Sequence, residues 1–283
     1  MKTDDLRKIF CELYDEKSKS RPYDFQLLDF SKENYFEKNI PALYRYSSAD
    51  YYNIRSLETK KIHLSEIGNM NDIFEGLSCK TTDKELSCIN KLKDSAYIKS
   101  FSENANDLSM WSRYADNFAG MCVKYNVNKL DDNILCHLYP IRYSDSRLMN
   151  EKLYYIFDFL RELKQSQYDQ SCIDNIDFLE DLMSLFLSKS KIWEYEAEWR
   201  LIFSYLQLNV GYEEIANGQN EDEKILYDFD SKNIDFDCAV EIYIGPKMEA
   251  MKREHIKEIG KKLNIKVTEM QLSNDSYQLI EST

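Results

Sequence analysis

Three glutamates at every second position directly precede an apolar run in the segment KIWEYEAEWRLIF, residues 191–203. Like charges on one strand face repel each other, and a carboxylate that enters a core is costly unless a partner neutralises it. One interpretation is a helix end, in which Glu196 pairs with Arg200 four residues later. The other is a Glu-x-Glu pair, Glu196 and Glu198, at the start of a buried strand, where the carboxylates serve a chemical purpose.

The composition is that of a folded protein with an acidic surface. Hydrophobic residues make up 43% of the 283 residues, which is enough for one large domain with an ample core. The net charge of −13 argues against a broad surface for duplex nucleic acid, because such a surface needs many Lys and Arg side chains. No apolar run approaches the ~18 residues of a membrane span, and the charged N-terminus has no signal-peptide pattern. We therefore expect a cytoplasmic protein without a membrane partner.

Several familiar chemistries have no support in the sequence. The seven cysteines form no C-x-x-C pair and there are only three histidines, so we expect free thiols and no zinc cluster. The glycine-rich fingerprints of dinucleotide and P-loop folds are absent. The histidines lie far apart and beside no nucleophilic elbow, which gives no basis for a hydrolase triad.

Short segments alternate between strand and helix periodicity along the chain. Strand patterns occur in LYRYSS, KIHLSE, AYIKSFSE, MCVKYNV and ILCHLYPIRYSD, and helix patterns occur in SADYYNIRSLETK, capped by Ser47 or Ser48, and in DLSMWSRYAD, capped by Asp107. The C-terminal part predicts β–α–β in AVEIYIGP, MEAMKREHIKEIGKKLN and IKVTEMQL. We predict a single α+β domain over residues 1–283, with a mixed, mostly antiparallel central sheet. It carries an N-terminal helical extension over residues 1–40 and a helical insertion over residues 148–190.

Two of the strand patterns contain polar residues that are candidates for a functional site. Arg45 lies between two tyrosines in LYRY, and an arginine there is either structural or a clamp for a pyrophosphate, which its forked donors suit. Ser100 and Ser102 lie on one face of their strand at its end. A Ser-x-Ser pair alone is common and indicates little.

A polar loop and a helix supply further candidates. In NMNDIFEG, Asp72 forms either an Asx turn or, with Asn69, Asn71 and Glu75, an oxygen-rich site for Mg²⁺ or Ca²⁺. Trp111 and Tyr114 lie three residues apart on one helix face. They are either a packed aromatic pair or a shelf for nicotinamide or adenine.

Taken together, these segments resemble a bacterial family catalogued as domain of unknown function 2971. The resemblance rests on LYRYSS, IHLSEIGNMNDIFEG, SFSENANDLSMWSRYADNFAGMCVKY, KIWEYEAEWRLIF and VEIYIGP, and it spans roughly residues 41–247. Such a loop usually carries Asn-Asp-Pro, whereas Ile73 stands here in place of the proline. The family name itself implies no activity.

The order of the polar motifs also resembles that of the arginine-class ADP-ribosyltransferases, which carry an arginine, a Ser-x-Ser and a Glu-x-Glu on successive strands. The resemblance implies NAD as substrate, with Glu198, Glu196 and Arg45 as catalytic residues. It also implies that Arg45, Tyr46, Ser100, Ser102, Asn71, Asp72, Trp111 and Tyr114 bind NAD. The acceptor of the ADP-ribose stays open between a protein, a nucleic acid and a small molecule. A toxin or phage-defence role follows by analogy alone.

The chemistry of this reaction accounts for crowded carboxylates. Cleavage of the nicotinamide–ribose bond develops positive charge on the ribose, which a carboxylate stabilises. Period-2 spacing predicts that Glu196 and Glu198 share one side of an extended chain, and we expect Arg45 close to both. Two alternatives stay open. One is a Mg²⁺-dependent nuclease built on Asp72, Glu75 and the two glutamates. The other is a non-enzymatic interaction module with a structural Arg–Glu network.

Overall fold

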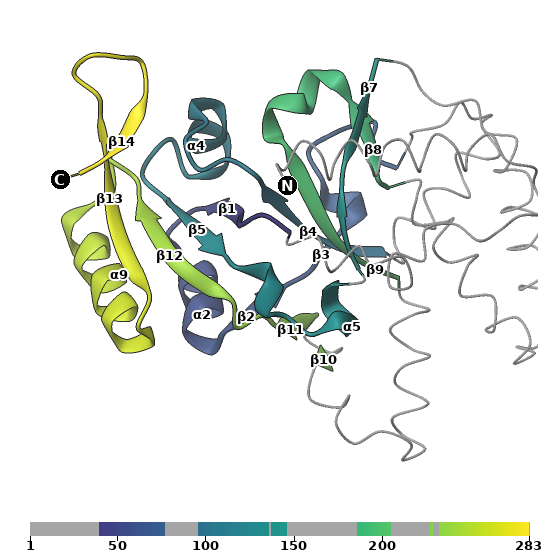
Figure 1. Cartoon of the computed structure of the whole chain (residues 1–283), viewed down its shortest axis with the longest axis horizontal. Helices are drawn as coiled ribbons and strands as arrows, with labels where there is room; N and C mark the ends of the chain where they lie inside the picture. Colours follow the sequence, from purple (N-terminus) through teal and green to yellow (C-terminus); the bar gives the residue numbers. More distant parts are fainter. Residues whose placement is uncertain are drawn as a thin grey trace, which may run out of the picture.

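The computed structural model describes residues 40–76, 96–135, 137–145, 186–204, 227–228 and 232–282 (Figure 1). The strands are β1 (Leu43–Ser47), β2 (Lys61–His63), β3 (Ser65–Glu66), β4 (Ala96–Ser102), β5 (Met121–Tyr125), β6 (Leu138–Pro140), β7 (Arg142–Ser144), β8 (Ser188–Ser190), β9 (Glu198–Ser204), β10 (Tyr227–Asp228), β11 (Asn233–Asp235), β12 (Ala239–Ile244), β13 (Lys266–Leu272) and β14 (Leu279–Glu281). The α-helices are α2 (Tyr51–Thr59), α4 (Leu108–Tyr114), α5 (Asp132–Leu135) and α9 (Ala250–Leu263), and the 3₁₀ helices are η2 (Ile67–Asn69), η3 (Val127–Lys129) and η5 (Lys191–Glu196).

A large mixed sheet organises the described part of the chain. Its strand order there is β14-β13-β12-β5-β1-β4-β9-β6, and β3 also pairs with β4. Among these strands only β12 and β13 run parallel, joined by α9 as their crossover helix. Smaller sheets have the orders β10-β11-β2 and β7-β8. The predicted α+β class with a mostly antiparallel central sheet is confirmed.

Each face of the central sheet is covered by different helices. On one face, Leu43, Val123 and Ile242 belong to a buried apolar cluster that also contains Leu57 of α2 and Ile256 of α9. On the other face, α4 packs against a second buried cluster. That cluster contains Tyr46, Met110, Trp111, Ala115, Cys122, Tyr243, Met270 and Leu279. Around β1, β5 and β12 the two faces therefore pack against different clusters, and the sheet lies between their side chains.

The register of three central strands determines which polar side chains share a face. Tyr44 of β1 lies opposite Ser102 of β4, which lies opposite Glu198 of β9. Ser100 lies opposite Arg200 in the same way. Since side chains alternate along a strand, all five residues lie on the face that α4 covers.

Most local predictions are confirmed, with three differences. Asp107 caps α4 by accepting the Met110 amide at 2.9 Å, as predicted. The cap of α2 is Asp50, not Ser47 or Ser48, because the Asp50 carboxylate accepts the backbone amide of Asn53 at 2.9 Å. The segment KIHLSE forms two short strands, β2 and β3, in place of one.

The third difference concerns the predicted helical insertion. Its last residues, 188–190, form strand β8, which pairs with β7 through the Arg142–Ser188 register. Residues 148–185 of the insertion and residues 1–39 of the N-terminal extension lie outside the described residues.

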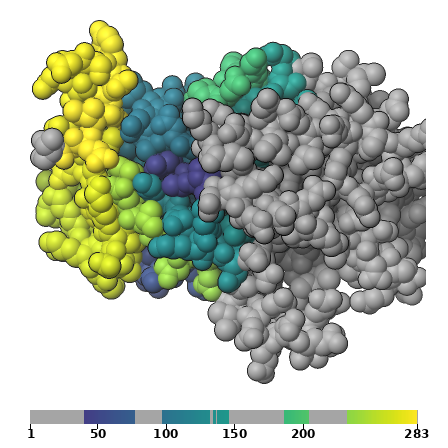
Figure 2. All heavy atoms as spheres, viewed as in Figure 1, coloured from purple at the N-terminus to yellow at the C-terminus, as the bar shows by residue number. Residues whose placement is uncertain are grey.

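The C-terminal β–α–β unit forms one end of the described molecule (Figures 1 and 2). Strands β12 and β13, with α9 between them in sequence, match the three predicted segments. Gly260 of α9 lies against Val267, and a Cβ at this glycine would come within 2.2 Å of the valine side chain. The close contact holds the helix on the sheet. No helix in the described part is long and apolar enough to cross a membrane.

Candidate functional site

Glu198 begins β9 and is buried among two cations and a hydroxyl. Its carboxylate accepts bonds from Arg200 Nε at 2.7 Å and Arg200 Nη2 at 3.2 Å. Lys189 Nζ donates to it at 3.2 Å, and the Ser100 hydroxyl also bonds to it. The backbone amide of Glu198 donates to the Tyr143 hydroxyl at 2.8 Å. Ser100 is thus the serine of the Ser-x-Ser pair that holds this glutamate.

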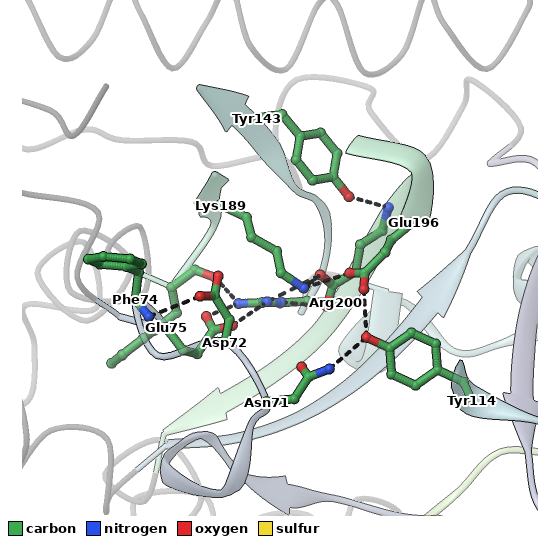
Figure 3. Close-up of polar contacts among 11 residues, drawn as sticks. Asn71, Asp72, Phe74, Glu75, Tyr114, Tyr143, Lys189, Glu196 and Arg200 are labelled. Atoms are coloured by element: carbon green, nitrogen blue, oxygen red, sulfur yellow. Dashed lines mark hydrogen bonds and ion pairs between the residues drawn. The ribbon is translucent and has the colours of Figure 1, made fainter. Parts of the chain in front are cut away.

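Arg200 is wholly buried and joins Glu198 to a distant loop. Its Nη1 and Nη2 atoms donate to the two carboxylate oxygens of Glu75 at 2.5 and 2.8 Å (Figure 3). Nη1 also donates to the backbone carbonyl of Phe186 at 2.6 Å. A forked pair of this kind is the geometry that a guanidinium and a carboxylate favour. Arg200 thus pairs with Glu198 and Glu75, and not with Glu196, so the pairing expected at a helix end does not form, although Glu196 does end a 3₁₀ helix.

Glu196 reaches the same cluster by a different route. It ends η5, and Ala197 after it adopts a left-handed conformation with φ 42°, so the chain is not extended through both glutamates as predicted. The Glu196 carboxylate nevertheless accepts Lys189 Nζ at 2.6 Å and the Tyr114 hydroxyl at 2.6 Å (Figure 3). Asn71 in turn donates to that hydroxyl at 2.8 Å. Lys189 therefore joins both glutamates.

These contacts form a buried row of alternating charges in the order Glu75, Arg200, Glu198, Lys189 and Glu196. Figure 3 shows the polar contacts in and around this row. Burial raises the pKa of Glu198, but the charges of Arg200 and Lys189 and the hydrogen bonds of Arg200 and Ser100 outweigh it and lower the pKa to about 2. Burial lowers the pKa of Lys189, but Glu198 and Glu196 outweigh it and raise that pKa. Glu198 is therefore ionised at neutral pH.

Two aromatic rings of η5, the 3₁₀ helix that ends at Glu196, lie against an arginine of α4. The Arg113 guanidinium lies 5.5 Å from the Trp193 ring centroid and 5.6 Å from that of Tyr195. Lys189 Nζ lies 4.8 Å from the Trp193 centroid. Such distances allow cation–π attraction. Arg113 is exposed, so this edge of the site presents a positive charge to solvent.

The Asn-Asp loop brings Glu75 to Arg200. Asp72 is buried and accepts the Phe74 amide on its side chain at 2.9 Å, while its carbonyl accepts the Glu75 amide at 3.0 Å. Gly76 follows with φ 68°. Asp72 thus forms the Asx turn that the sequence suggested. Within the described residues no group of three or more His, Cys, Asp or Glu side chains is arranged to hold a metal ion, which leaves the nuclease alternative without a site there.

Arg45 does not join the glutamates, so the expectation that it lies beside them is wrong. Tyr44 shares the face of Ser102 and Glu198, and the next residue along β1 must point to the opposite face. There Arg45 Nη1 donates to the Asn53 side chain of α2 at 3.3 Å. The sheet itself separates its guanidinium from Glu196 and Glu198.

The other predicted binding residues divide between the core and the site. Tyr46 donates its hydroxyl to the Asn104 carbonyl at 2.6 Å, and its ring packs edge-on against Trp111 at 5.4 Å. Trp111 is fully buried, which fits the packed-pair interpretation, although its partner is Tyr46 and not Tyr114. Ser102 is buried beside Glu198 in register and accepts the Asn104 amide at 3.1 Å. Of the aromatic candidates only Tyr114 contacts a glutamate.

Lys189, the cation between the two glutamates, was not predicted from the sequence. It lies in a region predicted to be helical, and its local sequence SKS carries no signal for an ion pair. Glu75 was predicted only as a candidate metal ligand. Its role depends on Arg200, which lies 125 positions further along the chain.

Part of the chain matches a known protein family. Residues 110–201 match a family model described as Protein of unknown function (DUF2971). The matched range includes Tyr114, Lys189, Glu196, Glu198 and the first residues of β9. No curated protein and no solved structure matches the chain. Over residues 110–201, this match supports the family that the sequence motifs indicated.

Proposed function

We propose that the protein is an ADP-ribosyltransferase-like enzyme that cleaves NAD and transfers ADP-ribose to an acceptor. The observation that supports this most is the bond from Ser100 to Glu198, made where the Ser-x-Ser strand β4 pairs with the Glu-x-Glu strand β9. Strand β1 lies next in the sheet, so the three motif-bearing strands are neighbours. Arg45 is not part of this proposal, because it lies on the other face.

In the proposed reaction the bond between ribose C1′ and the nicotinamide nitrogen breaks, and its electron pair neutralises the pyridinium. The ribose carries positive charge in the transition state, and the ionised Glu198 stabilises it. The acceptor then forms a bond to C1′ through a lone pair and releases its proton to Glu196. Arg113, exposed at the same edge, supplies a positive charge for the pyrophosphate.

The decisive experiment measures nicotinamide release and NAD binding by the wild-type chain. Release that falls by about 10²–10³-fold in Glu198→Gln, and not in Glu258→Gln, supports the assignment. Glu258 is the matched control because it is exposed on α9, far from β9 in the sheet order. Absence of both NAD binding and nicotinamide release in the wild-type protein overturns the proposal.

Glu196→Gln separates the two steps. The amide that replaces the carboxylate still accepts a hydrogen bond from Tyr114 but cannot take the acceptor's proton. We expect slower transfer to an acceptor, with NAD hydrolysis by water largely retained. Equal loss of both activities contradicts the role given to Glu196.

A second candidate function is a non-enzymatic interaction module. It is favoured by the complete neutralisation of Glu198, whose oxygens are shared between Arg200 and Lys189 while Arg200 is also held by Glu75. Buried networks of this kind are often structural. Because these bonds also stabilise the fold, Glu198→Gln is expected to lower the melting temperature in either case. A change in melting temperature therefore does not distinguish the two functions, whereas a change in the rate of nicotinamide release does.

A further inference from the structure

The ammonium of Lys189 occupies the space between the two glutamates that the proposed reaction uses. Its Nζ atom lies 2.6 Å from a carboxylate oxygen of Glu196 and 3.2 Å from one of Glu198. The centroid of the Trp193 ring lies 4.8 Å from the same atom. Carboxylates and an aromatic face are the groups with which proteins bind organic cations. Lys189 therefore fills a cation site with a cation of the chain itself (Figure 3).

The same contact keeps both carboxylates from a substrate. The side chains of Lys189, Glu196 and Glu198 are each 5% exposed, so a substrate does not reach them in this conformation. A carboxylate whose charge is already neutralised by a close ammonium also stabilises a further positive charge less strongly. The reaction proposed for Glu198 thus requires a conformation in which Lys189 has left this space.

The glutamates keep other donors when Lys189 leaves. Glu198 retains the bonds from Arg200 at 2.7 and 3.2 Å. Glu196 retains the bond from the Tyr114 hydroxyl at 2.6 Å. Neither carboxylate is then buried without a hydrogen-bond donor, which would be the costly arrangement.

A rotation of the lysine side chain is enough to open the contact. Lys189 lies on β8, which in the described part of the chain pairs with β7 and not with a strand of the central sheet. Its ammonium ends a flexible four-carbon stem. Trp193 beside it is partly exposed, so solvent begins within one side chain of the ammonium. The pairing of β4 with β9 does not depend on the position of this stem.

We propose that Lys189 is an internal inhibitor of the glutamate site, which a cationic group of the substrate must displace. This inference rests on the function proposed above and adds a regulator to the same site. The pyridinium ring of NAD carries the charge that competes with the ammonium, and the ribose carries it in the transition state. Because the lysine belongs to the chain, its effective concentration at the site is high. A substrate therefore binds only the fraction of molecules in which Lys189 has turned away.

Removal of the ammonium should raise activity, whereas removal of a structural or catalytic group would lower it. We expect Lys189→Met to raise kcat/KM for nicotinamide release at least about tenfold, mainly through a lower KM, because an open state populated to about 10% or less becomes the major one. Lys189→Arg keeps a cation between the glutamates and should not raise it. If Lys189→Met does not fold, Lys189→Gln replaces it, because the amide keeps a donor for Glu196.

Lys191→Met is the matched control. Lys191 lies two positions further along the chain, its side chain is 54% exposed, and its Nζ atom lies 3.8 Å from Asp145. The substitution removes the same charge without touching the glutamates. It should leave nicotinamide release unchanged.

Propylammonium tests the cation site without the reaction. Lys189→Ala removes the part of the side chain beyond Cβ, which has the size and charge of propylammonium. We expect propylammonium chloride to raise the melting temperature of Lys189→Ala above its value in sodium chloride at equal ionic strength, since a ligand that binds only the folded state stabilises it. It should not do so in the wild type or in Lys191→Ala. It should also return nicotinamide release by Lys189→Ala towards the wild-type rate.

The possible results separate the inhibitory role from the proposed reaction. Release by the wild type that Lys189→Met does not raise, or that Lys191→Met raises equally, overturns the inhibitory role and leaves the reaction standing. Absence of NAD binding and nicotinamide release in every protein overturns the reaction and the inhibitory role with it. A melting temperature of Lys189→Ala that does not respond to propylammonium overturns the cation site, and so does an equal response in Lys191→Ala.

Discussion

At the scale of single residues, Glu198 shows how a carboxylate is accommodated in a core. It is 3% exposed, and burial alone would raise its pKa. Arg200 and Lys189 reverse that effect because both lie within hydrogen-bonding distance of its oxygens. The neutralising charges come from the same strand and from β8, so the site exists only when both strands are in place.

This arrangement predicts a loss of stability in acid. The pKa of Glu198 is about 2 in the folded protein, against an ordinary value of 4.5. A lowered folded-state pKa contributes stability that is present above the unfolded value and is lost as the pH falls from about 4.5 towards 2. The difference corresponds to about 3 kcal/mol. Urea unfolding should show about 2 kcal/mol of this loss between pH 6 and pH 3. In Glu198→Gln the contribution of Glu198 to the pH dependence should be absent. An unchanged pH dependence in the variant contradicts the assignment.

Removal of Glu75 tests the other half of the Arg200 pair. Glu75→Ala leaves a buried guanidinium short of one of its two carboxylates, and we expect a loss of about 3–5 kcal/mol. Asn71→Ala is the control from the same loop. Asn71 is exposed, and among the described residues its side chain donates a hydrogen bond only to the Tyr114 hydroxyl. It should cost less than about 1 kcal/mol. Both values come from urea unfolding, and similar losses for the two variants would show that Arg200 does not need Glu75.

At the scale of elements, the junction between η5 and β9 determines where the two glutamates point. Ala197 takes a left-handed conformation there, and its amide donates to the Glu194 carbonyl at 3.1 Å. The turn lets Glu196 and Glu198 approach Lys189 from different elements. A left-handed residue other than glycine costs about 1 kcal/mol or more.

Glycine at this junction should therefore stabilise the protein. We expect Ala197→Gly to raise the free energy of unfolding by up to about 1 kcal/mol, because glycine adopts the left-handed region without strain. Ala250→Gly in α9 is the control and should have the opposite sign, since glycine weakens a helix. Thermal unfolding of the two variants measures both changes. A lower melting temperature for Ala197→Gly would contradict strain at the junction.

The cap of α2 gives a second prediction at this scale. Asp50→Ala should cost about 1 kcal/mol, because its carboxylate accepts the Asn53 amide at the helix N-terminus. Ser47→Ala should be close to neutral, because the Ser47 hydroxyl has no partner among the described residues. Chemical denaturation of both variants decides whether Asp50 or Ser47 caps the helix. A larger loss in Ser47→Ala would reverse the assignment.

At the scale of the whole molecule, the cysteines are predicted to be free. Cys122 and Cys238 are free and buried, and burial raises both of their pKa values, while the other five lie outside the described residues. Thiol titration of the denatured, unoxidised chain should count all seven, and five or fewer would contradict this. In the native protein Cys122 and Cys238 should react slowly, because a buried thiol is rarely ionised.

The local periodicity of the sequence predicted most of the central elements. β1, β4, β5, α9 and β13 occur where their patterns indicated, and Asp107 caps its helix. These features depend on contacts within a few residues, which the sequence displays directly. The cap of α2 was assigned to the wrong residue because three neighbouring residues, Ser47, Ser48 and Asp50, can all accept the same amide.

By itself the sequence determined which segments form strands and helices, and which carboxylates adjoin a buried strand. The tertiary structure decided which charges meet. A buried carboxylate is stabilised by whichever cations the fold brings within a few ångströms, and Arg200 finds Glu75 from 125 positions away. The face on which Arg45 lies follows from the register of β1 with β4, where a shift by one residue would reverse it. Strand register and long-range pairing are properties of the folded chain, so the composition of the site appeared only with the structure.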